Sequence, residues 1–158
     1  MRRPVARDAE ISRRCRFWND ANVSDPARDA IEAYYAAFNA GDPDAFVALV
    51  TDDVVHDINQ GAREIGKAAF RAFVERMNRK YREKLTDIVV FAEPGGTRGA
   101  AEFVVHGTYL ASDDGLPPAA GQSYRLPAGA FFEIRDGKVA RISNYYNLGD
   151  WIAQVSGS

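Results

Sequence analysis

The spacing of apolar residues changes near Leu85, and this change limits the folds that the chain can adopt. Before Leu85, apolar residues recur at positions i, i+3, i+4 and i+7 of one segment, namely Ile31, Tyr34, Tyr35 and Phe38. This period predicts a helix with one apolar face. After Leu85, β-branched and aromatic residues dominate four segments, 85–91, 100–110, 122–135 and 138–147. Helices followed by successive strands predict an α+β fold, in which a curved antiparallel sheet wraps around three helices.

Capping residues define the ends of these three helices. Asp25-Pro26 and Asp42-Pro43 each place an acid before a proline that suits the first helical position, and Gly41 ends the first helix. The second helix is expected to bury an apolar face made of Phe46, Leu49 and Val50. The third begins near residue 67 and carries apolar residues at helical spacing, Phe70, Phe73, Val74, Met77 and Tyr81.

Turn residues divide the second half of the chain into strands. Asp136-Gly137 lies between two apolar runs and predicts a tight hairpin, because both positions tolerate a positive φ. A short strand over 53–58 is expected between the second and third helices. A closing turn of helix is indicated by Trp151, Ile152 and Val155. A sheet of this kind leaves room for a cavity between itself and the first and third helices.

Length and charge fit one soluble domain. The chain has 158 residues and a net charge of −2, without the basic face or motif of a nucleic-acid-binding protein. Cys15 has no second cysteine to pair with, so no oxidising compartment is implied. No apolar run approaches the roughly 20 residues that cross a bilayer, and no signal-peptide core follows the start. We therefore expect a cytoplasmic protein with no membrane or nucleic-acid partner.

The first 23 residues differ from the rest of the chain. They contain six arginines and three acidic residues, and their apolar residues follow neither a helical nor a strand period. This composition predicts a flexible arginine-rich extension over 1–23, followed by one domain over 24–158.

Alternation along the expected strands separates side chains into two faces. The buried row of one strand consists of Tyr124, Leu126, Ala128, Ala130, Phe132 and Ile134. The corresponding row of the preceding strand consists of Ala101, Phe103, Val105, Gly107 and Tyr109. A third row carries Ile142, Asn144 and Tyr146. Small residues between aromatic ones favour the wall of a pocket, where Asn144 needs a hydrogen-bond partner in the protein or a ligand.

The strand over 53–58 is ambiguous. One row holds Val54, His56 and Ile58, and the other holds Val55, Asp57 and Asn59. Alternation alone does not decide which row faces inward. Taken by themselves, Asp57 is typical of a solvated acid at a strand end, and His56 of a surface or interface histidine.

Several stretches resemble a known family. Residues 33–42 read Ala-Tyr-Tyr-Ala-Ala-Phe-Asn-Ala-Gly-Asp, and residues 44–53 read Asp-Ala-Phe-Val-Ala-Leu-Val-Thr-Asp-Asp. With residues 66–70 and 136–142, they resemble bacterial ketosteroid isomerases and, more broadly, the SnoaL-like, nuclear-transport-factor-2-like (NTF2-like) superfamily. The resemblance covers about residues 25–152. It implies a cone of curved sheet around three helices, a deep apolar pocket and a homodimer.

The resemblance also implies roles for individual residues. The tyrosine that donates a hydrogen bond to the substrate oxygen falls on Tyr34, and the aspartate that acts as general base falls on Asp57. The second oxyanion donor of the family falls on or beside Ala130, and alanine has no such donor. Asn144 or Tyr146 is a candidate replacement, because each lies on a row that the family points inward.

We therefore predict a protein that binds a small apolar carbonyl compound and isomerises it by acid–base chemistry, without a cofactor. The expected substrate-binding residues are Asn144, Tyr146, Asn59, Phe73, Phe103, Val105, Tyr109, Ala130 and Ile142. No metal is predicted, because the histidines and carboxylates lack ligand spacing. The face of the sheet opposite the core is expected to contact a second copy through His106, Thr108 and Phe131.

Two alternatives remain open at this stage. A polyketide-type cyclase would close a ring by an intramolecular aldol reaction with the same acid–base pair. A non-catalytic module for lipophilic ligands or dimerisation is favoured by the alanine at position 130.

Overall fold

The computed structural model describes residues 25–59 and 61–157. The expected extension over 1–23 lies outside the described residues. The elements follow in the order α2 (Pro26–Ala40), α3 (Pro43–Ala48), β1 (Val50–Asp57), β2 (Arg63–Ile65), α4 (Lys67–Lys80), β3 (Tyr81–Ala92), β4 (Arg98–Tyr109), β5 (Ser123–Arg135), β6 (Lys138–Tyr146) and α5 (Leu148–Val155).

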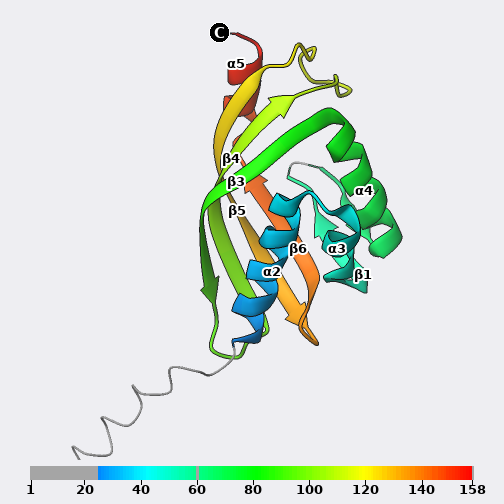
Figure 1. The fold of residues 1–158 in the computed structure, drawn as a ribbon, viewed down its shortest axis with the longest axis vertical. Coiled ribbons are helices and arrows are strands. Elements are labelled where there is room, and N and C mark those ends of the chain that lie inside the picture. The colour runs from blue at the N-terminus through cyan, green and yellow to red at the C-terminus, as the bar shows by residue number, and fades with distance from the viewer. Residues whose placement is uncertain (1–24, 60, 158) are drawn as a thin grey trace, which may run out of the picture.

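The strands form one curved six-stranded sheet in the order β2-β1-β6-β5-β4-β3. Helices α2, α3 and α4 lie on its concave side, and α5 lies at the far end near the C-terminus (Figure 1). The predicted α+β fold is confirmed. The prediction of an antiparallel sheet is wrong at one place, because β1 runs parallel to β6, and the short strand β2 was not predicted.

Local signals explain the first helix. The Asp25 side chain accepts a hydrogen bond from the backbone N–H of Arg28 at 3.1 Å, which satisfies a free donor of the first turn of α2. Gly41 ends α2 with a φ of 69°, in the left-handed region that favours glycine. The cap at Asp42 works in the same way, through the N–H of Ala45.

Two helix boundaries differ from the prediction. Helix α3 ends at Ala48, so Val50 is not on its inner face but opens β1 opposite Val139. The Val139 N–H donates to the Leu49 carbonyl, so sheet pairing competes with helix continuation at this point. Helix α4 ends at Lys80, and Tyr81 opens β3.

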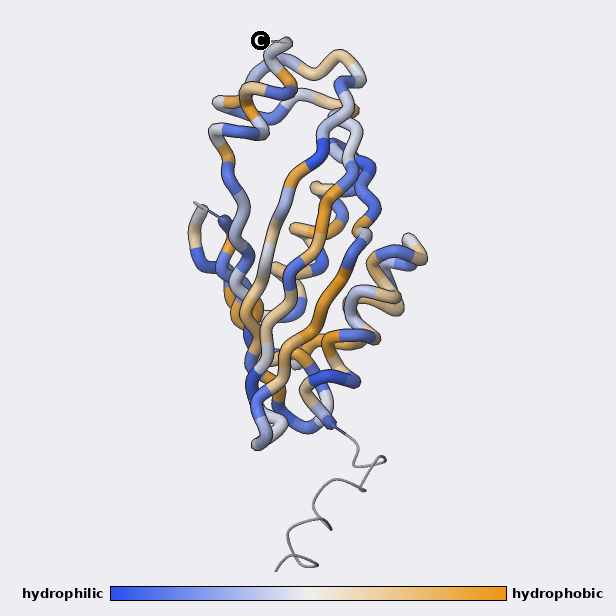
Figure 2. The backbone as a smooth tube through the Cα atoms, turned by 90° about the vertical axis from the view of Figure 1, so that its left-hand side faces the viewer, coloured by the Kyte–Doolittle hydropathy of each residue, from blue (hydrophilic) through white to orange (hydrophobic). Residues whose placement is uncertain are grey.

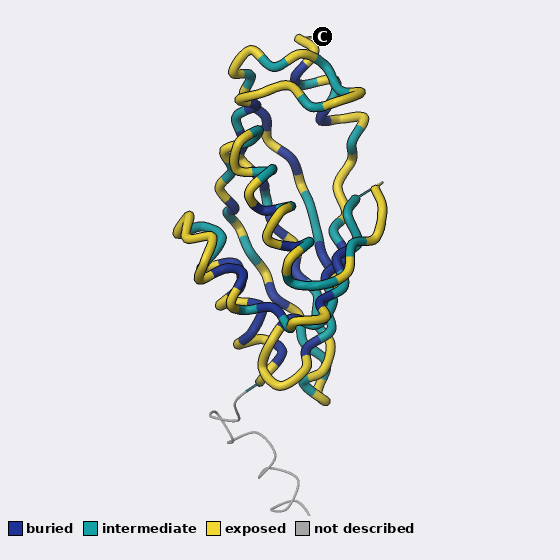
Figure 3. Tube along the Cα trace, turned by 90° about the vertical axis from the view of Figure 1, so that its right-hand side faces the viewer, coloured by how far each residue is buried: buried dark blue, intermediate teal, exposed yellow. Residues whose placement is uncertain are grey.

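The hairpin and the buried rows are confirmed. Asp136 and Gly137 both have positive φ, 52° and 71°, between β5 and β6. In the view from the sheet side, the strands contain both apolar and polar residues along their length (Figure 2). From the helix side, buried stretches run along the strands behind the helices (Figure 3). We call the side of the sheet that faces the helices the inner face, and the other the outer face.

Candidate functional site

Strand β1 turns His56 rather than Asp57 toward the helices. Val54 and His56 are 1% and 2% exposed, whereas Asp57 belongs to the alternate row. The His56 ring lies 4.5 Å from the ring of Phe73 and 5.4 Å from that of Phe70, both on α4. The ambiguity of this strand is thereby resolved, and the inner row is the one that carries the histidine.

Asp57 lies on the outer face among cationic and hydroxyl groups. Arg63 Nε donates to Asp57 Oδ1 at 2.6 Å, and the Ser143 hydroxyl donates to Oδ2 at 2.6 Å. These hydrogen bonds hold the pKa of Asp57 below its usual range, and the charges of Arg63 and Arg141 act in the same direction. A general base in a dry pocket needs the opposite shift, so this geometry does not support the expected role of Asp57.

Tyr34 lies on the inner side, within a packed aromatic cluster. Its ring centroid is 4.4 Å from that of Phe46 and 5.6 Å from that of Phe132, and the residue is 5% exposed. Burial raises the pKa of its hydroxyl well above the usual value. The contacts therefore give Tyr34 a packing role, and its expected donor role stays a prediction.

The expected substrate-binding residues divide into three groups. The Asn59 side chain bonds the backbone of Tyr146 and ties the end of β1 to β6, so its observed contacts are structural. Asn144, Tyr146 and Phe73 lie on the inner side and keep part of their surface exposed. The fully packed group consists of Phe103, Val105, Tyr109, Ala130 and Ile142.

A half-buried acid, Glu83, does occur on the inner face, on β3. Glu83 pairs with Gly107 on β4, and Gly107 pairs with Tyr124 on β5, so the three residues share one row across the sheet. The Tyr124 hydroxyl donates to Glu83 Oε1. Burial raises the pKa of Glu83, and the hydrogen bond from Tyr124 offsets this rise only in part.

Gly107 makes this contact possible. A Cβ atom at position 107 would lie 2.0 Å from Tyr124 Cζ, so the tyrosine ring occupies the space that any larger residue would fill. The ring therefore crosses β4 and brings its hydroxyl to a carboxyl two strands away.

A second acid, Asp113, contacts the junction of α4 and β3, where Lys80 and Tyr81 precede Glu83 in the chain. The Lys80 ammonium pairs with Asp113, and the Tyr81 hydroxyl donates to Asp113 at 3.3 Å. Burial raises the pKa of Tyr146, a side-chain hydrogen bond with Asn59 lowers it, and the negative charges of Glu83 and Asp113 raise it. These residues form a polar cluster on an otherwise apolar face, and we call Glu83, Tyr124, Tyr146, Tyr81 and Asp113 the Glu83 cluster.

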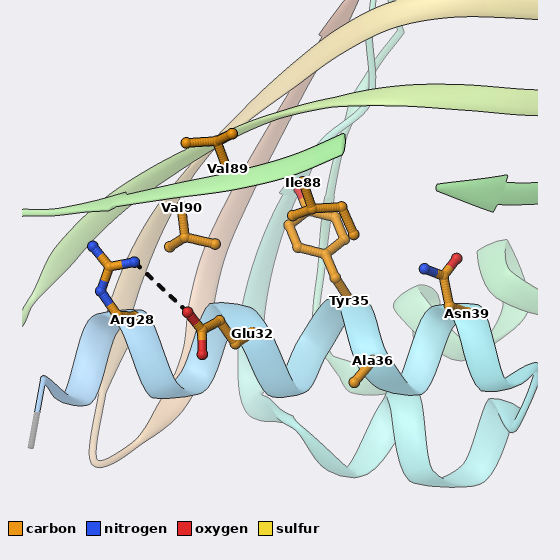
Figure 4. A pocket seen from close by; sticks show the side chains of 8 residues that line it. All are labelled: Arg28, Glu32, Tyr35, Ala36, Asn39, Ile88, Val89 and Val90. Carbon is orange, nitrogen blue, oxygen red and sulfur yellow. Dashed lines mark ion pairs between the residues drawn. The ribbon is translucent and has the colours of Figure 1, made fainter. Parts of the chain in front are cut away.

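Two open grooves mark the described surface. One, of about 480 Å³, runs between α2 and β3, where Tyr35 points toward the sheet and Arg28 pairs with Glu32 (Figure 4). The other lies at the ends of β5 and β6 and is lined by Ala128 and Tyr146, both of the inner row. Pro127, Gly129 and Tyr145 of the outer row also line this groove, so it lies across the edge of the sheet, and Tyr146 is the residue of the Glu83 cluster that lines it. The enclosed chamber expected from the resemblance stays a prediction.

Within residues 25–59 and 61–157, no three His, Cys, Asp or Glu side chains are grouped so that they could hold a metal ion. In the same part of the chain, no helix has the length and apolar character to cross a membrane.

The chain is similar to known proteins in both sequence and structure. A SnoaL-like domain matches residues 31–142, which is more than half of the chain. The chain belongs to the SnoaL-like family. None of the curated proteins matches it.

Solved structures agree with this family. A candidate polyketide cyclase from Pseudomonas putida is 62% identical, with a TM-score of 0.81 over 84% of this chain and 99% of that one. A candidate polyketide cyclase from Xanthomonas campestris is 59% identical, with a TM-score of 0.79 over 82% and 96% of the two chains. A third, from Silicibacter, is 52% identical, with a TM-score of 0.80 over 85% and 98%.

Sequence reasoning missed Glu83 in this SnoaL-like chain, although a signal was present. Tyr81, Glu83 and Leu85 alternate, so a charged residue stands between two apolar residues of one row. The assignment of Tyr81 to the preceding helix hid this alternation.

Proposed function

We propose that this SnoaL-like protein transfers a proton on a small apolar carbonyl compound without a cofactor, as an isomerase or a cyclase. The hydrogen bond between Glu83 and Tyr124 on the inner face carries the proposal. A carboxyl and a phenol held together at a half-buried position are groups that proton abstraction next to a carbonyl can use.

Glu83 is the general base of this proposal. Its carboxylate takes a proton from the carbon beside the carbonyl, and the electron pair of that C–H bond moves to form an enolate. The same carboxyl then returns the proton to another carbon, which completes an isomerisation. A raised pKa suits this work, because a base is most effective when its pKa lies near the working pH.

Tyr146 supports the developing enolate. The charge of Glu83 acts on its phenol, and the residue lines the groove at the ends of β5 and β6. A preorganised donor at the position where negative charge develops typically contributes a factor of about 10²–10³ in rate. Asp57 as base with Tyr34 as donor is the rival assignment, and replacement of each carboxylate by its amide distinguishes the two.

Ring closure is the second candidate reaction. Three solved relatives at 52–62% identity are candidate polyketide cyclases, which favours this reaction. The carbanion formed by Glu83 would then attack a second carbonyl carbon of the same molecule, and the resulting alkoxide would take up the proton.

Exchange of α-protons in D₂O tests the proposal without knowledge of the natural substrate. We would follow 3-cyclohexenone, 1,3-cyclohexanedione and a linear triketide by NMR, with buffer alone as the reference. Both candidate reactions begin with loss of an α-proton, so exchange faster than in buffer is expected for at least one compound. Exchange at the buffer rate for all three, with a bound unaltered ligand, would favour the non-catalytic binding module.

A second copy of this chain is the partner that we propose for the outer face. Val89, Phe91, Phe131 and Tyr145 are each at least 45% exposed, and the register places them on adjacent rows of β3, β5 and β6. Exposed apolar patches of this kind mark association surfaces.

Replacing Phe131 with arginine is expected to convert a dimer into a monomer, because a charge would be buried without a partner at the contact. Light scattering coupled to size-exclusion chromatography measures the mass. A wild-type mass of 17.4 kDa would contradict the homodimer.

A further inference from the structure

Tyr35 has a hydroxyl group without a partner. The residue is 4% exposed, and its hydroxyl oxygen is buried with no hydrogen-bond partner among the described residues. Its ring centroid lies 5.1 Å from that of Phe103 and 5.9 Å from that of Phe132. A phenylalanine would make the same ring contacts, so packing does not account for the hydroxyl. Buried polar groups are nearly always paired, and an unpaired one calls for an explanation.

The same side chain lines the groove of about 480 Å³ between α2 and β3 (Figure 4). The helix contributes residues that recur on one face of α2, namely Arg28, Glu32, Tyr35, Ala36 and Asn39. The strand contributes three successive residues, 88–90, and Tyr35 points from the helix toward this strand. The unpaired hydroxyl therefore belongs to a wall of the groove and not to the middle of the core.

Two features of the fold shape one end of this groove. Asn39 Nδ2 donates to the Leu85 carbonyl at 2.9 Å, and the Leu85 N–H donates to Asn39 Oδ1 at 2.9 Å, which ties α2 to β3. Directly after this tie, β3 contains one extra residue between Thr86 and Val89, where Asp87 has a φ of 53°. Such a bulge bends its strand. The groove is therefore built into the fold.

The groups that line the groove select a class of ligand. Arg28 and Glu32 pair with each other at 3.6 Å, so the charges of the lining cancel and an uncharged ligand is favoured. Burial raises the pKa of Tyr35, so its hydroxyl stays protonated at neutral pH and is available as a donor. A carbonyl oxygen needs only such a donor, whereas a ligand hydroxyl would bring a proton that needs a second partner.

We propose that this groove binds an uncharged compound with a carbonyl oxygen on an apolar ring system, and that the Tyr35 hydroxyl donates to this oxygen. Ala36 and Ile88 offer apolar surface to the rings. The hydroxyl oxygen is covered in the free protein, and the half-buried Ile88 side chain uncovers it by a change of rotamer.

This site is separate from the Glu83 cluster. Tyr35 meets β4 at Phe103, which is four residues and about 13 Å along the strand from Gly107 in the Glu83 row. Glu83 does not line the groove. Binding here is therefore independent of the proposed reaction.

Two probes that differ only in the carbonyl group test the site. 1-Indanone and indane have the same fused rings, and only 1-indanone carries an acceptor oxygen. In ¹⁵N-labelled protein, the backbone amide signals of Ala36 and Asn39 report occupation of the groove, and that of Gly107 reports the Glu83 row. Tyr34→Phe is the matched control, because it removes the hydroxyl of the neighbouring residue of α2, which does not line the groove.

Titration with 1-indanone is expected to shift the Ala36 and Asn39 signals. Tyr35→Phe should weaken the binding of 1-indanone about fivefold, the usual effect of one lost neutral hydrogen bond, and should leave the affinity for indane unchanged. Tyr34→Phe should change neither affinity at the groove. Ala36→Leu, at an exposed helix position, should fill the groove and abolish the shifts that both probes cause.

The stability of the free protein gives a second readout. Removal of a buried hydroxyl that has no partner relieves an uncompensated loss of hydration. Tyr35→Phe is therefore expected to unfold at a higher urea concentration than the wild type. A lower unfolding midpoint would show that the hydroxyl is satisfied within the protein, and would overturn the proposed site.

Two binding results would also overturn it. They are groove signals that 1-indanone leaves unmoved, or a Tyr35→Phe variant that binds 1-indanone as well as the wild type or loses as much affinity for indane as for 1-indanone. None of these results bears on the exchange of α-protons, so the proposed function is tested separately.

Discussion

Replacing Glu83 with glutamine is expected to lower the rate of α-proton exchange by a factor of about 10²–10⁴, the usual contribution of a positioned general base. Glutamine keeps the shape and accepts the hydrogen bond from the Tyr124 hydroxyl through its carbonyl oxygen, so the fold is retained. Because the substitution removes only the proton acceptor, kcat is expected to fall and KM to change little. Exchange kinetics in D₂O measure both parameters.

Asp57→Asn is the matched control, since it also replaces a carboxylate with an amide. Asp57 lies on the outer face with Arg63 and Ser143 as partners, so its loss is expected to leave the exchange rate unchanged. The reverse result, with an inactive Asp57→Asn and an active Glu83→Gln, would restore Asp57 as the base and contradict our assignment.

Gly107→Ala is expected to cost both stability and activity. The added Cβ would lie 2.0 Å from Tyr124 Cζ and 2.4 Å from its hydroxyl oxygen, so the ring must leave its place over β4. Overpacking of a buried site typically costs about 1–3 kcal/mol of unfolding free energy. The displaced hydroxyl would no longer reach Glu83, and the exchange rate should fall with it.

Gly99→Ala separates the two effects. It lies on the same strand, and its added Cβ would approach Ile31 Cδ1 at 2.5 Å, far along β4 from the Glu83 row. Denaturant unfolding should show a loss of stability in both variants, whereas exchange kinetics should show a loss of activity in Gly107→Ala only. Equal activities in the two variants would contradict the role of the Tyr124 contact.

The sequence contained enough information for most of the fold. Asp25, Gly41 and Asp42 mark helix ends, because each caps or terminates the adjacent helix through its own side chain or backbone conformation. Asp136-Gly137 marks a hairpin, because both residues adopt the positive φ that a tight turn requires. The rows of β4 and β5 followed from alternation, since one face of each strand is clearly more apolar. Such signals do not depend on the rest of the chain.

The site was harder to predict, because it depends on contacts between distant segments. The two rows of β1 are similarly apolar, so the sequence does not show which row is buried. The pairing of β1 with β2 and β6 places His56 on the inner face and Asp57 on the outer face. In β3, the register shifts between Thr86 and Val89, where Asp87 has a φ of 53°. The alternation of inward and outward side chains breaks at this irregularity. The residues after it, up to 91, therefore do not show that Glu83 faces inward.

The pKa of the Glu83 carboxyl tests the central claim most directly. Carbon NMR of protein labelled at the glutamate carboxyls would follow the one resonance that disappears in Glu83→Gln. Our account predicts that this carboxyl ionises clearly above the ordinary value of 4.5, because burial disfavours its charged form. Ionisation at or below 4.5 would show a solvated acid and would contradict the account.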